Sequence, residues 1–383
     1  MRLAPLALLV LLLSVPWGPP LRGQTGGDTG PTAGVRPDGG GAFIRGGGLE
    51  LRVLGYVQST LTAYPRSFRR DDAPAAFEIR RARLDFLATL GPDHTLFIEL
   101  DGAPGARTAL VEAWMDWKLA GPALTVRAGK FISRFSAENL RSSRSLLTAE
   151  RYMALNSMFF LPALDTQTGV ALLGSGLAGG RLGWEVGVYN GNGQASANRA
   201  EDNDAKELQG RLVLTPGTGL DASVAVDWTR EGSRRLRLLD LAFNEYVGVE
   251  VEGERLGWTA DVSWSRGPWS VASEVLSFTF DTPEGGEVGL RGGYVQPAWF
   301  ARGDAGGGLQ LLLRGERAAL VDRPAGAADA LTSLTVGLNW YPSGNSRLQV
   351  NAVATRANGP APSQGFTRAR WLPLLLTQLQ LKL

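Results

Sequence analysis

Four arginines share one long polar segment, residues 132–165, and their side chains are well suited to binding anions. The arginines are Arg134, Arg141, Arg144 and Arg151. Three acidic residues stand among them, namely Glu138, Glu150 and Asp165. A guanidinium group presents a planar fork of N–H donors that matches the oxygens of phosphates and carboxylates. Charge content alone leaves two interpretations open: an anion-attracting constriction, or a loop whose charges simply face water.

Two scarce residue types restrict the other chemistry that this chain can perform. The 383 residues include no cysteine and a single histidine, His94. The lack of cysteine excludes a disulfide framework, a zinc–thiolate site, an iron–sulfur cluster and a cysteine nucleophile. One histidine cannot form a two-histidine metal site, and a serine–histidine–aspartate hydrolase would depend on His94, which stands beside a short turn. We therefore expect no metal ion and no catalytic site.

One glycine-rich segment satisfies a nucleotide-binding pattern by spacing alone. Residues 174–179 read G-x-G-x-x-G. A dinucleotide site needs a helix directly after this pattern, so that amide groups at its first turn face the pyrophosphate. Residues 182–189 alternate instead as a strand does, so the glycines indicate a turn, and we expect no cofactor.

The N-terminal 48 residues divide into two parts. A charged start and an apolar stretch over residues 3–15, too short to span a bilayer, predict a signal peptide over residues 1–23. Three prolines directly after the apolar stretch disfavour the alternative, a buried first helix. Residues 24–48 are rich in Gly, Thr and Pro without periodicity, which predicts a flexible linker. An exported chain without cysteine needs a fold that closes without disulfides.

From residue 49 onward, apolar and polar side chains alternate, as in strands whose two faces meet different surroundings. Long polar connections, such as residues 65–76 and 132–165, alternate with short turns such as residues 91–93. We count 16 strands, with about 21 residues for each strand and its connection. The sequence therefore predicts an all-β, 16-stranded antiparallel transmembrane β-barrel over residues 49–383, with short periplasmic turns, long extracellular loops and an inward-folded third loop, residues 132–165.

Two further features favour a barrel in the outer membrane of a Gram-negative-type bacterium. Eight tryptophans fall near expected strand ends, where such barrels carry an aromatic girdle. They are Trp117, Trp184, Trp228, Trp264, Trp269, Trp299, Trp340 and Trp371. The last ten residues, Leu374 to Leu383, resemble the terminal strand that the outer-membrane assembly machinery recognises, although Leu stands where Phe is usual. A soluble secreted β-sandwich or solenoid would also alternate, but it explains neither the loop asymmetry nor this ending.

Four short motifs stand in order along the expected barrel. Residues 79–86 look like an FRRA-x-L-x-F strand, and residues 126–131 look like a strand ending in [F/A]-G-[RK]-F. Residues 142–151 contain a Ser-Ser pair followed by Thr-Ala-Glu-Arg, and residues 337–341 read G-L-N-W-Y. Together they resemble the phosphate-selective porin O and porin P family of outer-membrane channels, over the whole of the expected barrel.

The resemblance implies a trimer of 16-stranded channels, in which a ladder of arginines draws anions to an eyelet lined by the third loop. By position, Arg80 and Arg81 match the family's second-strand arginine pair. Ser142 and Ser143 match its eyelet serines, and Arg151 matches its eyelet arginine. Further ladder candidates stand in the expected fifth loop, namely Arg230, Arg234, Arg235 and Arg237.

Two details depart from this pattern. The family's phosphate-contacting lysine falls on Asn139, so Arg141 or Arg144 would have to supply that charge. The alternation places Arg80 on the apolar side of its strand, which makes Arg81 the better candidate for the lumen.

These observations predict a passive outer-membrane porin that prefers small anions, with phosphate as one candidate permeant. A formal net charge of only +2, from 39 basic and 37 acidic residues, gives no indication of a nucleic-acid partner. The expected partners are outer-membrane lipid, the barrel-assembly machinery, permeating anions and further copies of the chain in a homotrimer. A non-selective or carbohydrate porin, a barrel enzyme, and a plugged structural or adhesive barrel remain alternatives.

Overall fold

The computed structural model describes most of the expected barrel and part of the segment before it. The described residues are 30–36, 40–64, 75–103, 108–161, 164, 166–191, 204–323, 328–359 and 371–383. The signal peptide predicted over residues 1–23 lies outside them.

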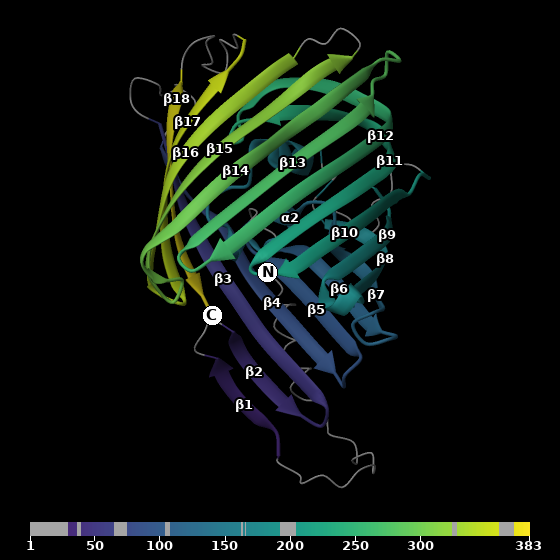
Figure 1. Cartoon of the computed structure of the whole chain (residues 1–383), viewed down its shortest axis with the longest axis vertical. Coiled ribbons are helices and arrows are strands. Elements are labelled where there is room, and N and C mark those ends of the chain that lie inside the picture. The colour runs from purple at the N-terminus through teal and green to yellow at the C-terminus, as the bar shows by residue number, and fades with distance from the viewer. Residues whose placement is uncertain are drawn as a thin grey trace, which may run out of the picture.

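Sixteen antiparallel strands, β3 to β18, close into a barrel within the described residues (Figure 1). Each strand pairs with the next along the chain, and the barrel closes where β18 pairs with β3, from Lys382 opposite Tyr56 to Leu375 opposite Ala63. The 16-stranded fold predicted from the alternation is confirmed. Closure pairs the two edge strands with each other, which is the condition for a sheet to stand in lipid.

The strands are longer on the C-terminal side of the barrel than around β5 to β9. In the first half they are β3 (Leu49–Ala63), β4 (Ala76–Leu90), β5 (His94–Asp101), β6 (Ala109–Lys118), β7 (Thr125–Ile132), β8 (Thr166–Gly176), β9 (Leu182–Tyr189) and β10 (Glu207–Gly217). In the second half they are β11 (Leu220–Leu239), β12 (Glu245–Arg266), β13 (Trp269–Asp281), β14 (Glu287–Asp304), β15 (Gly307–Arg323), β16 (Ala328–Ser343), β17 (Ser346–Ala357) and β18 (Leu372–Lys382).

Two short strands precede the barrel, in the segment that the sequence predicts to be a flexible linker. Strand β1 (Thr32–Arg36) pairs with β2 (Gly41–Gly46), which in turn pairs with the first residues of β3, from Leu49 to Val53. Strand β18 reaches only as far as Tyr56 on β3. The lower part of β3 therefore offers an open edge, and β2 satisfies its backbone groups. Residues 32–36 and 41–46 are thus a hairpin and not part of a linker.

The arginine-rich stretch after residue 230 is also a correction. It continues β11 up to Leu239, paired with β12, whereas the sequence predicts a loop there. The pairing shifts register between Glu231 and Arg234 and then resumes. Charged residues such as Arg235 and Arg237 on the outer face hide such a strand, because this part of that face does not meet lipid.

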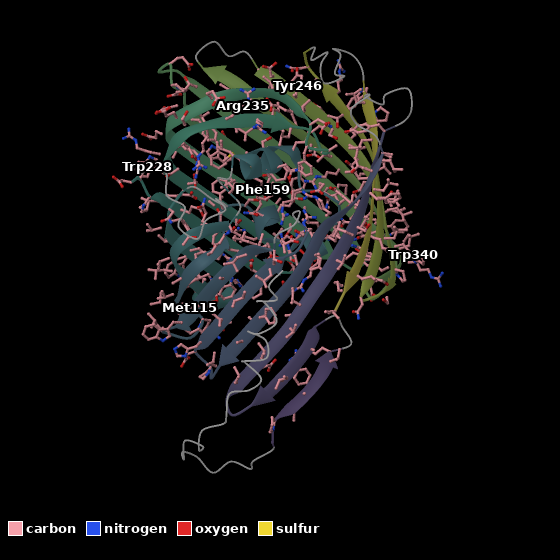
Figure 2. All side chains as sticks on the ribbon, turned by 180° about the vertical axis from the view of Figure 1, so that it is seen from behind. Met115, Phe159, Trp228, Arg235, Tyr246 and Trp340 are labelled. Carbon is pink, nitrogen blue, oxygen red and sulfur yellow. The ribbon has the colours of Figure 1, made fainter. Side chains whose placement is uncertain are left out.

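The two faces of the wall differ in the way the alternation predicts. Seven of the eight tryptophans expected in the girdle are exposed on the outer surface, all but Trp184. Figure 2 shows Trp228, Trp340 and Met115 projecting from the wall, while Phe159 lies inside. Inward positions carry polar side chains in one part of the lumen and an apolar cluster in another, where Leu236, Phe278 and Leu290 are fully buried.

Four short helical segments are described: α2 (Ala137–Leu140), η2 (Ser143–Ser145), α3 (Met153–Phe160) and α4 (Leu177–Gly180). Among the described residues, no helix is long and apolar enough to cross a membrane. Segment α4 lies in the G-x-G-x-x-G stretch and forms the turn between β8 and β9, with Ala178 and Gly179 in the left-handed region. It has no straight helical run that could present amide groups to a phosphate.

Candidate functional site: the third loop inside the barrel

The third loop leaves β7 and runs through the lumen before it joins β8. Ser136 begins α2, and its hydroxyl oxygen accepts a hydrogen bond from the Asn139 amide at 3.1 Å. Further along, α3 packs against the inner faces of β11, β14 and β15. Met153, Leu155 and Met158 of α3 are fully buried in the apolar cluster. The apolar part of the lumen is therefore filled by this loop.

Amide side chains on the inner wall hold the loop backbone. Gln58 on β3 donates to the Ser143 carbonyl at 3.2 Å, and Gln380 on β18 donates to the Arg144 carbonyl at 3.2 Å. Strands β16 and β17 continue the series. Asn339 donates to the Leu147 carbonyl at 2.9 Å, Arg347 donates to the Leu146 carbonyl at 2.8 Å, and Asn351 accepts from the Ala149 amide at 2.8 Å. Irregular backbone away from water needs such partners, so the loop is fixed against β16, β17, β18 and β3.

Arg80 and Arg81 on β4 both bind Glu150 of the loop. Arg80 Nε lies 2.6 Å from Glu150 Oε1, and Arg81 Nη2 lies 3.5 Å from Glu150 Oε2. Arg81 also donates to Gln58 at 2.9 Å. A β-bulge explains why neighbouring residues can share one partner: Gln58 pairs with Arg81 and Ser59 with Ile79, which leaves Arg80 as the extra residue. The placement of Arg80 on the apolar face, predicted from strict alternation, is therefore wrong.

The charge on Glu150 is stabilised by this pair of arginines. Burial raises the pKa of the Glu150 carboxyl, but the positive charges of Arg80 and Arg81 outweigh burial, so its pKa is lowered from the usual value. Glu150 is thus ionised over the whole physiological range, and it neutralises part of the positive charge that the two arginines bring to the lumen.

Two more arginines hold the loop in shape. Arg314 on β15 makes a bidentate ion pair with Glu138, at 3.0 Å for each nitrogen, and donates to Thr148 at 2.7 Å. Arg151 is only 8% exposed and donates to loop carbonyls, among them that of Arg141 at 3.0 Å. It also donates to the Ser143 hydroxyl at 3.3 Å. The guanidinium of Arg151 therefore braces the turn that carries α2 and η2.

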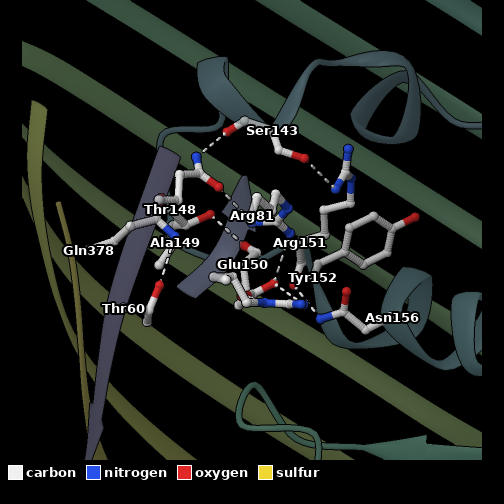
Figure 3. A network of polar contacts seen from close by, with 12 residues as sticks. Thr60, Arg81, Ser143, Thr148, Ala149, Glu150, Arg151, Tyr152, Asn156 and Gln378 are labelled. Carbon is white, nitrogen blue, oxygen red and sulfur yellow. Dashed lines mark hydrogen bonds and ion pairs between the residues drawn. The ribbon is translucent and has the colours of Figure 1, made fainter. Parts of the chain in front are cut away.

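The structure brings Arg80, Arg81, Ser143 and Arg151 into one polar network around Glu150 (Figure 3). Ser142 lies at the N-cap of η2, where its carbonyl accepts from the Ser145 amide at 2.8 Å.

Arg141 and Arg144 are half-buried at the lumen side of the loop. The nearest carboxylate to Arg144 is Asp85, with the paired atoms 4.0 Å apart. The guanidinium of Arg141 makes no hydrogen bond or ion pair with any described residue, although Asp261 and Tyr294 lie within its electrostatic reach.

The other predicted arginines lie elsewhere. Arg134, at the start of the loop, pairs with Glu185 on β9 through its Nε at 2.7 Å. Arg234 faces inward and donates to the Leu161 carbonyl at 3.0 Å. Arg235 and Arg237 alternate with the buried Leu236 and Leu238, so they lie on the outer face.

Outward placement corrects the arginine ladder predicted for β11. Arg235 pairs with Glu245 and Glu250 at 2.9 and 3.2 Å, and Arg237 pairs with Glu245 at 3.5 Å. Arg230 is exposed on the same face of the strand as Trp228. Once β11 is a strand, every second side chain points away from the lumen, and Arg230, Arg235 and Arg237 cannot contact a permeating ion.

Asn139 has a structural role at the position where the resemblance places a lysine. It is 1% exposed, and its side-chain amide donates to the carbonyls of Leu164 and Ser133. These bonds tie the two ends of the loop together, so a charged lysine here would have to displace them.

Sequence reasoning missed the wall residues that hold the loop, chiefly Arg314, Arg347 and the amides of β16 to β18. It also missed a buried cluster in which Arg255 pairs with Glu207 at 3.0 Å and with Asp227 at 2.8 Å. A usable signal existed: a polar side chain between two outward leucines or valines, as in Leu348-Gln349-Val350, marks an inward position. Within the described parts of the chain, no group of three or more acidic or histidine side chains is placed to hold a metal ion.

The turn after β11 crosses the extracellular opening. Asn244 donates to the Tyr64 hydroxyl at 2.7 Å, and the Phe243 ring lies 4.9 Å from the Arg80 guanidinium. Strands β11 and β3 are half the barrel apart, so this turn spans the lumen above the third loop. A cavity of about 250 Å³ remains beneath it, lined in part by Glu150 and Phe243.

Comparison with known proteins agrees with this architecture. The family model described as phosphate-selective porin O and P matches residues 52–234 and 242–368. No curated protein sequence matches the chain. Among solved structures, a loop-deletion mutant of OmpT from Vibrio cholerae aligns with a TM-score of 0.63 at 10% identity, covering 88% of this chain and 100% of that one.

Two further solved structures give similar scores. The anion-selective porin from Comamonas acidovorans aligns with a TM-score of 0.62 at 11% identity, covering 88% of this chain and 100% of that one. The outer membrane channel DcaP of Acinetobacter baumannii gives 0.58 at 12% identity, with coverage of 88% and 94%. At such identities the structural matches establish a porin-like barrel, whereas the family match extends over most of the sequence. The chain belongs to the phosphate-selective porin O and P family of the Gram-negative outer membrane.

Proposed function

We propose that this outer-membrane porin conducts small anions in preference to cations, past the arginines of its third loop. The observation that carries the proposal is the set of guanidinium groups near the loop that form no ion pair with a described carboxylate. Arg141 has no ion-pair partner among the described residues, and Arg347 binds a backbone carbonyl and the side-chain amide of Gln380. Fixed positive charge in a narrow lumen raises the local anion concentration.

Acidic residues on the nearby wall limit the size of this preference. Strands β4 to β6 carry Asp85, Glu99, Asp101 and Glu112, and Arg83 pairs with Glu99 and with Asp101 at 2.5 and 3.1 Å. Glu150 and Glu138 neutralise further arginines. We therefore expect a modest anion preference that depends on a few unpaired guanidinium groups, with phosphate as one of several small anions that pass.

The test is the reversal potential of the protein in a planar bilayer under a KCl gradient. We expect an anion-selective potential, and we expect Arg141→Gln to move it towards zero. Arg235→Gln is the matched control, because it removes the same charge from the outer face. A cation-selective wild type, or an equal effect of both variants, would contradict the proposal.

We also propose that the protein is a homotrimer, inserted by the barrel-assembly machinery through β18. OmpT of Vibrio cholerae, a structural neighbour at 11% identity, has a trimer form. Strand β18 ends the chain with Leu375, Leu379 and Leu381 exposed on the lipid side. Mass measurement of the detergent-solubilised protein by light scattering tests the trimer, and a monomeric mass would refute it.

A further inference from the structure

Three arginines stand on the outer wall of the barrel, within the four consecutive strands β14 to β17. They are Arg291 on β14, Arg317 on β15 and Arg356 on β17, and all three are exposed. Their neighbours in sequence, Leu290, Ala318 and Ala357, are buried in the interior apolar cluster. Because successive side chains of a strand point to opposite faces, the arginines point outward.

The strand register brings these side chains close together. Arg317 lies opposite Gly293 on one side and Thr332 on the other, and Thr332 lies opposite Arg356. With strands about 4.8 Å apart, Arg317 and Arg356 are separated by about 10 Å along one row. Arg291 is two residues above Gly293, which places it within about 10 Å of Arg317.

The row lies at the extracellular edge of the apolar outer wall. Below it, the outward positions of β15 and β16 are apolar and exposed, among them Leu311, Leu313, Leu334 and Val336. Trp340 lies opposite Leu309, near the short turns. Arg317 stands eight residues after Leu309, which on a tilted strand is a height of about 20 Å, close to the apolar band of an outer-membrane barrel. The arginines therefore stand where lipid headgroups begin.

Arg291 and Arg317 differ from the arginines on the outer face of β11. Arg235 and Arg237 are paired with Glu245 and Glu250. Neither Arg291 nor Arg317 has a carboxylate partner in the part of the chain that the structure describes. The Arg317 side chain donates a hydrogen bond to the hydroxyl of Thr332 at 3.2 Å.

We propose that Arg291, Arg317 and Arg356 form a binding site for the phosphate group of a lipid in the outer leaflet. The fork of a guanidinium matches phosphate oxygens, and Arg317 and Arg356 in one row, with Arg291 just above it, supply the charge that one anionic headgroup needs. The acyl chains of the same lipid would lie on Leu313, Leu334 and Val336, directly below. This site is separate from the channel, since its side chains face away from the lumen.

Native mass spectrometry of the detergent-solubilised protein tests the proposal. Dioleoyl phosphatidic acid is the probe, and dioleoylglycerol, which lacks the phosphate, is its comparison. We expect bound phosphatidic acid on the wild type and at least a tenfold weaker affinity in the triple variant Arg291→Gln, Arg317→Gln, Arg356→Gln. An equal affinity of the triple variant, or equal binding of dioleoylglycerol, would overturn the site.

The control and the fallback use residues already placed. Arg235→Gln with Arg237→Gln removes two outward charges that are paired, and we expect it to bind phosphatidic acid within twofold of the wild type. A loss equal to that of the triple variant would overturn the assignment.

If the triple variant does not fold, Arg317→Gln alone should weaken binding at least twofold, and an unchanged affinity would refute the proposal. Excess inorganic phosphate should not displace the lipid; full displacement would point to a free-phosphate site instead. Because the readout is lipid mass, a failure here leaves the ion selectivity of the channel untouched.

Discussion

Replacing Glu150 by Gln removes one negative charge from the centre of the loop network while keeping the shape of the side chain. The amide oxygen of Gln can still accept from Arg80, and the anchors of the loop on either side, such as Thr148 and Ala149, are unchanged. We therefore expect the loop to keep its path and the net charge near the lumen to rise by one unit.

The size of the effect follows from the cavity that Glu150 lines. An ion near the centre of this space of about 250 Å³ lies about 6 Å from the carboxylate. In water the interaction energy between the ion and a unit charge at that distance is about 0.7 kcal/mol, and screening at 0.1 M salt reduces it to about 0.4 kcal/mol. Loss of the negative charge thus raises the local anion concentration about twofold and lowers that of cations about twofold.

We accordingly expect Glu150→Gln to raise the anion-to-cation permeability ratio about fourfold at 0.1 M KCl, and less than about 1.5-fold at 1 M, where the Debye length is ~3 Å. The assay is the reversal potential in a planar bilayer at both salt concentrations. Glu250→Gln is the control, since Glu250 pairs with Arg235 on the outer face. An unchanged ratio at 0.1 M, or the same change in the control, would refute the reasoning that Glu150 sets the charge of the pathway.

Three further predictions concern the same region. Arg151→Glu should release the loop turn, because it replaces a donor by a carboxylate that faces the backbone carbonyls now bound by Arg151. We expect noisier and larger single-channel currents, and a steady current of wild-type size would contradict this prediction. Acidification should raise the anion preference only below about pH 4.5, the usual carboxyl range, because the pKa of Glu150 is lowered. The ion pair of Glu150 with Arg80 and Arg81 is fully formed above that range, and it is lost as the pH falls through the lowered pKa. Reversal potentials between pH 7 and pH 3 measure this, and a change centred above pH 5 would exclude Glu150 as its source. Tyr64→Phe deletes the hydrogen bond from Asn244, which should destabilise the closed position of the turn after β11 by about 1 kcal/mol. Brief current fluctuations should then become more frequent, and identical fluctuation rates would show that this bond does not hold the turn.

Much of the fold could be predicted because a barrel in lipid has two unlike faces. Outward residues such as Leu313 and Val336 must be apolar, inward residues such as Arg314 and Gln349 meet water or the loop, and the period of two follows directly. Where this contrast ends, prediction fails. Above the membrane the outer face of β11 carries Arg235 and Arg237, so the strand resembles a polar loop. Strands β1 and β2 stand in a segment rich in Gly, Thr and Pro, and they were missed for that reason.

The site was predictable only in part. The arginines of the third loop can be recognised from their spacing, and the family resemblance implies that they attract anions to an eyelet. Their actual roles depend on partners far away in sequence: Glu150 meets Arg80 from β4, and Glu138 meets Arg314 from β15. No local pattern indicates that Arg151 donates to carbonyl groups while Arg141 has no ion-pair partner among the described residues.

The sequence by itself determined the strand periodicity, the alternation of long and short connections and hence a 16-stranded barrel, since each of these depends on which residues face lipid. The tertiary structure alone decided which charged side chains face the lumen without an ion-pair partner. A bulge of one residue turned Arg80 inward, and continuation of β11 turned Arg235 and Arg237 outward. A charge in such a barrel acts on a permeating ion only if its side chain reaches the lumen unpaired, and that depends on register and on contacts between strands distant along the chain.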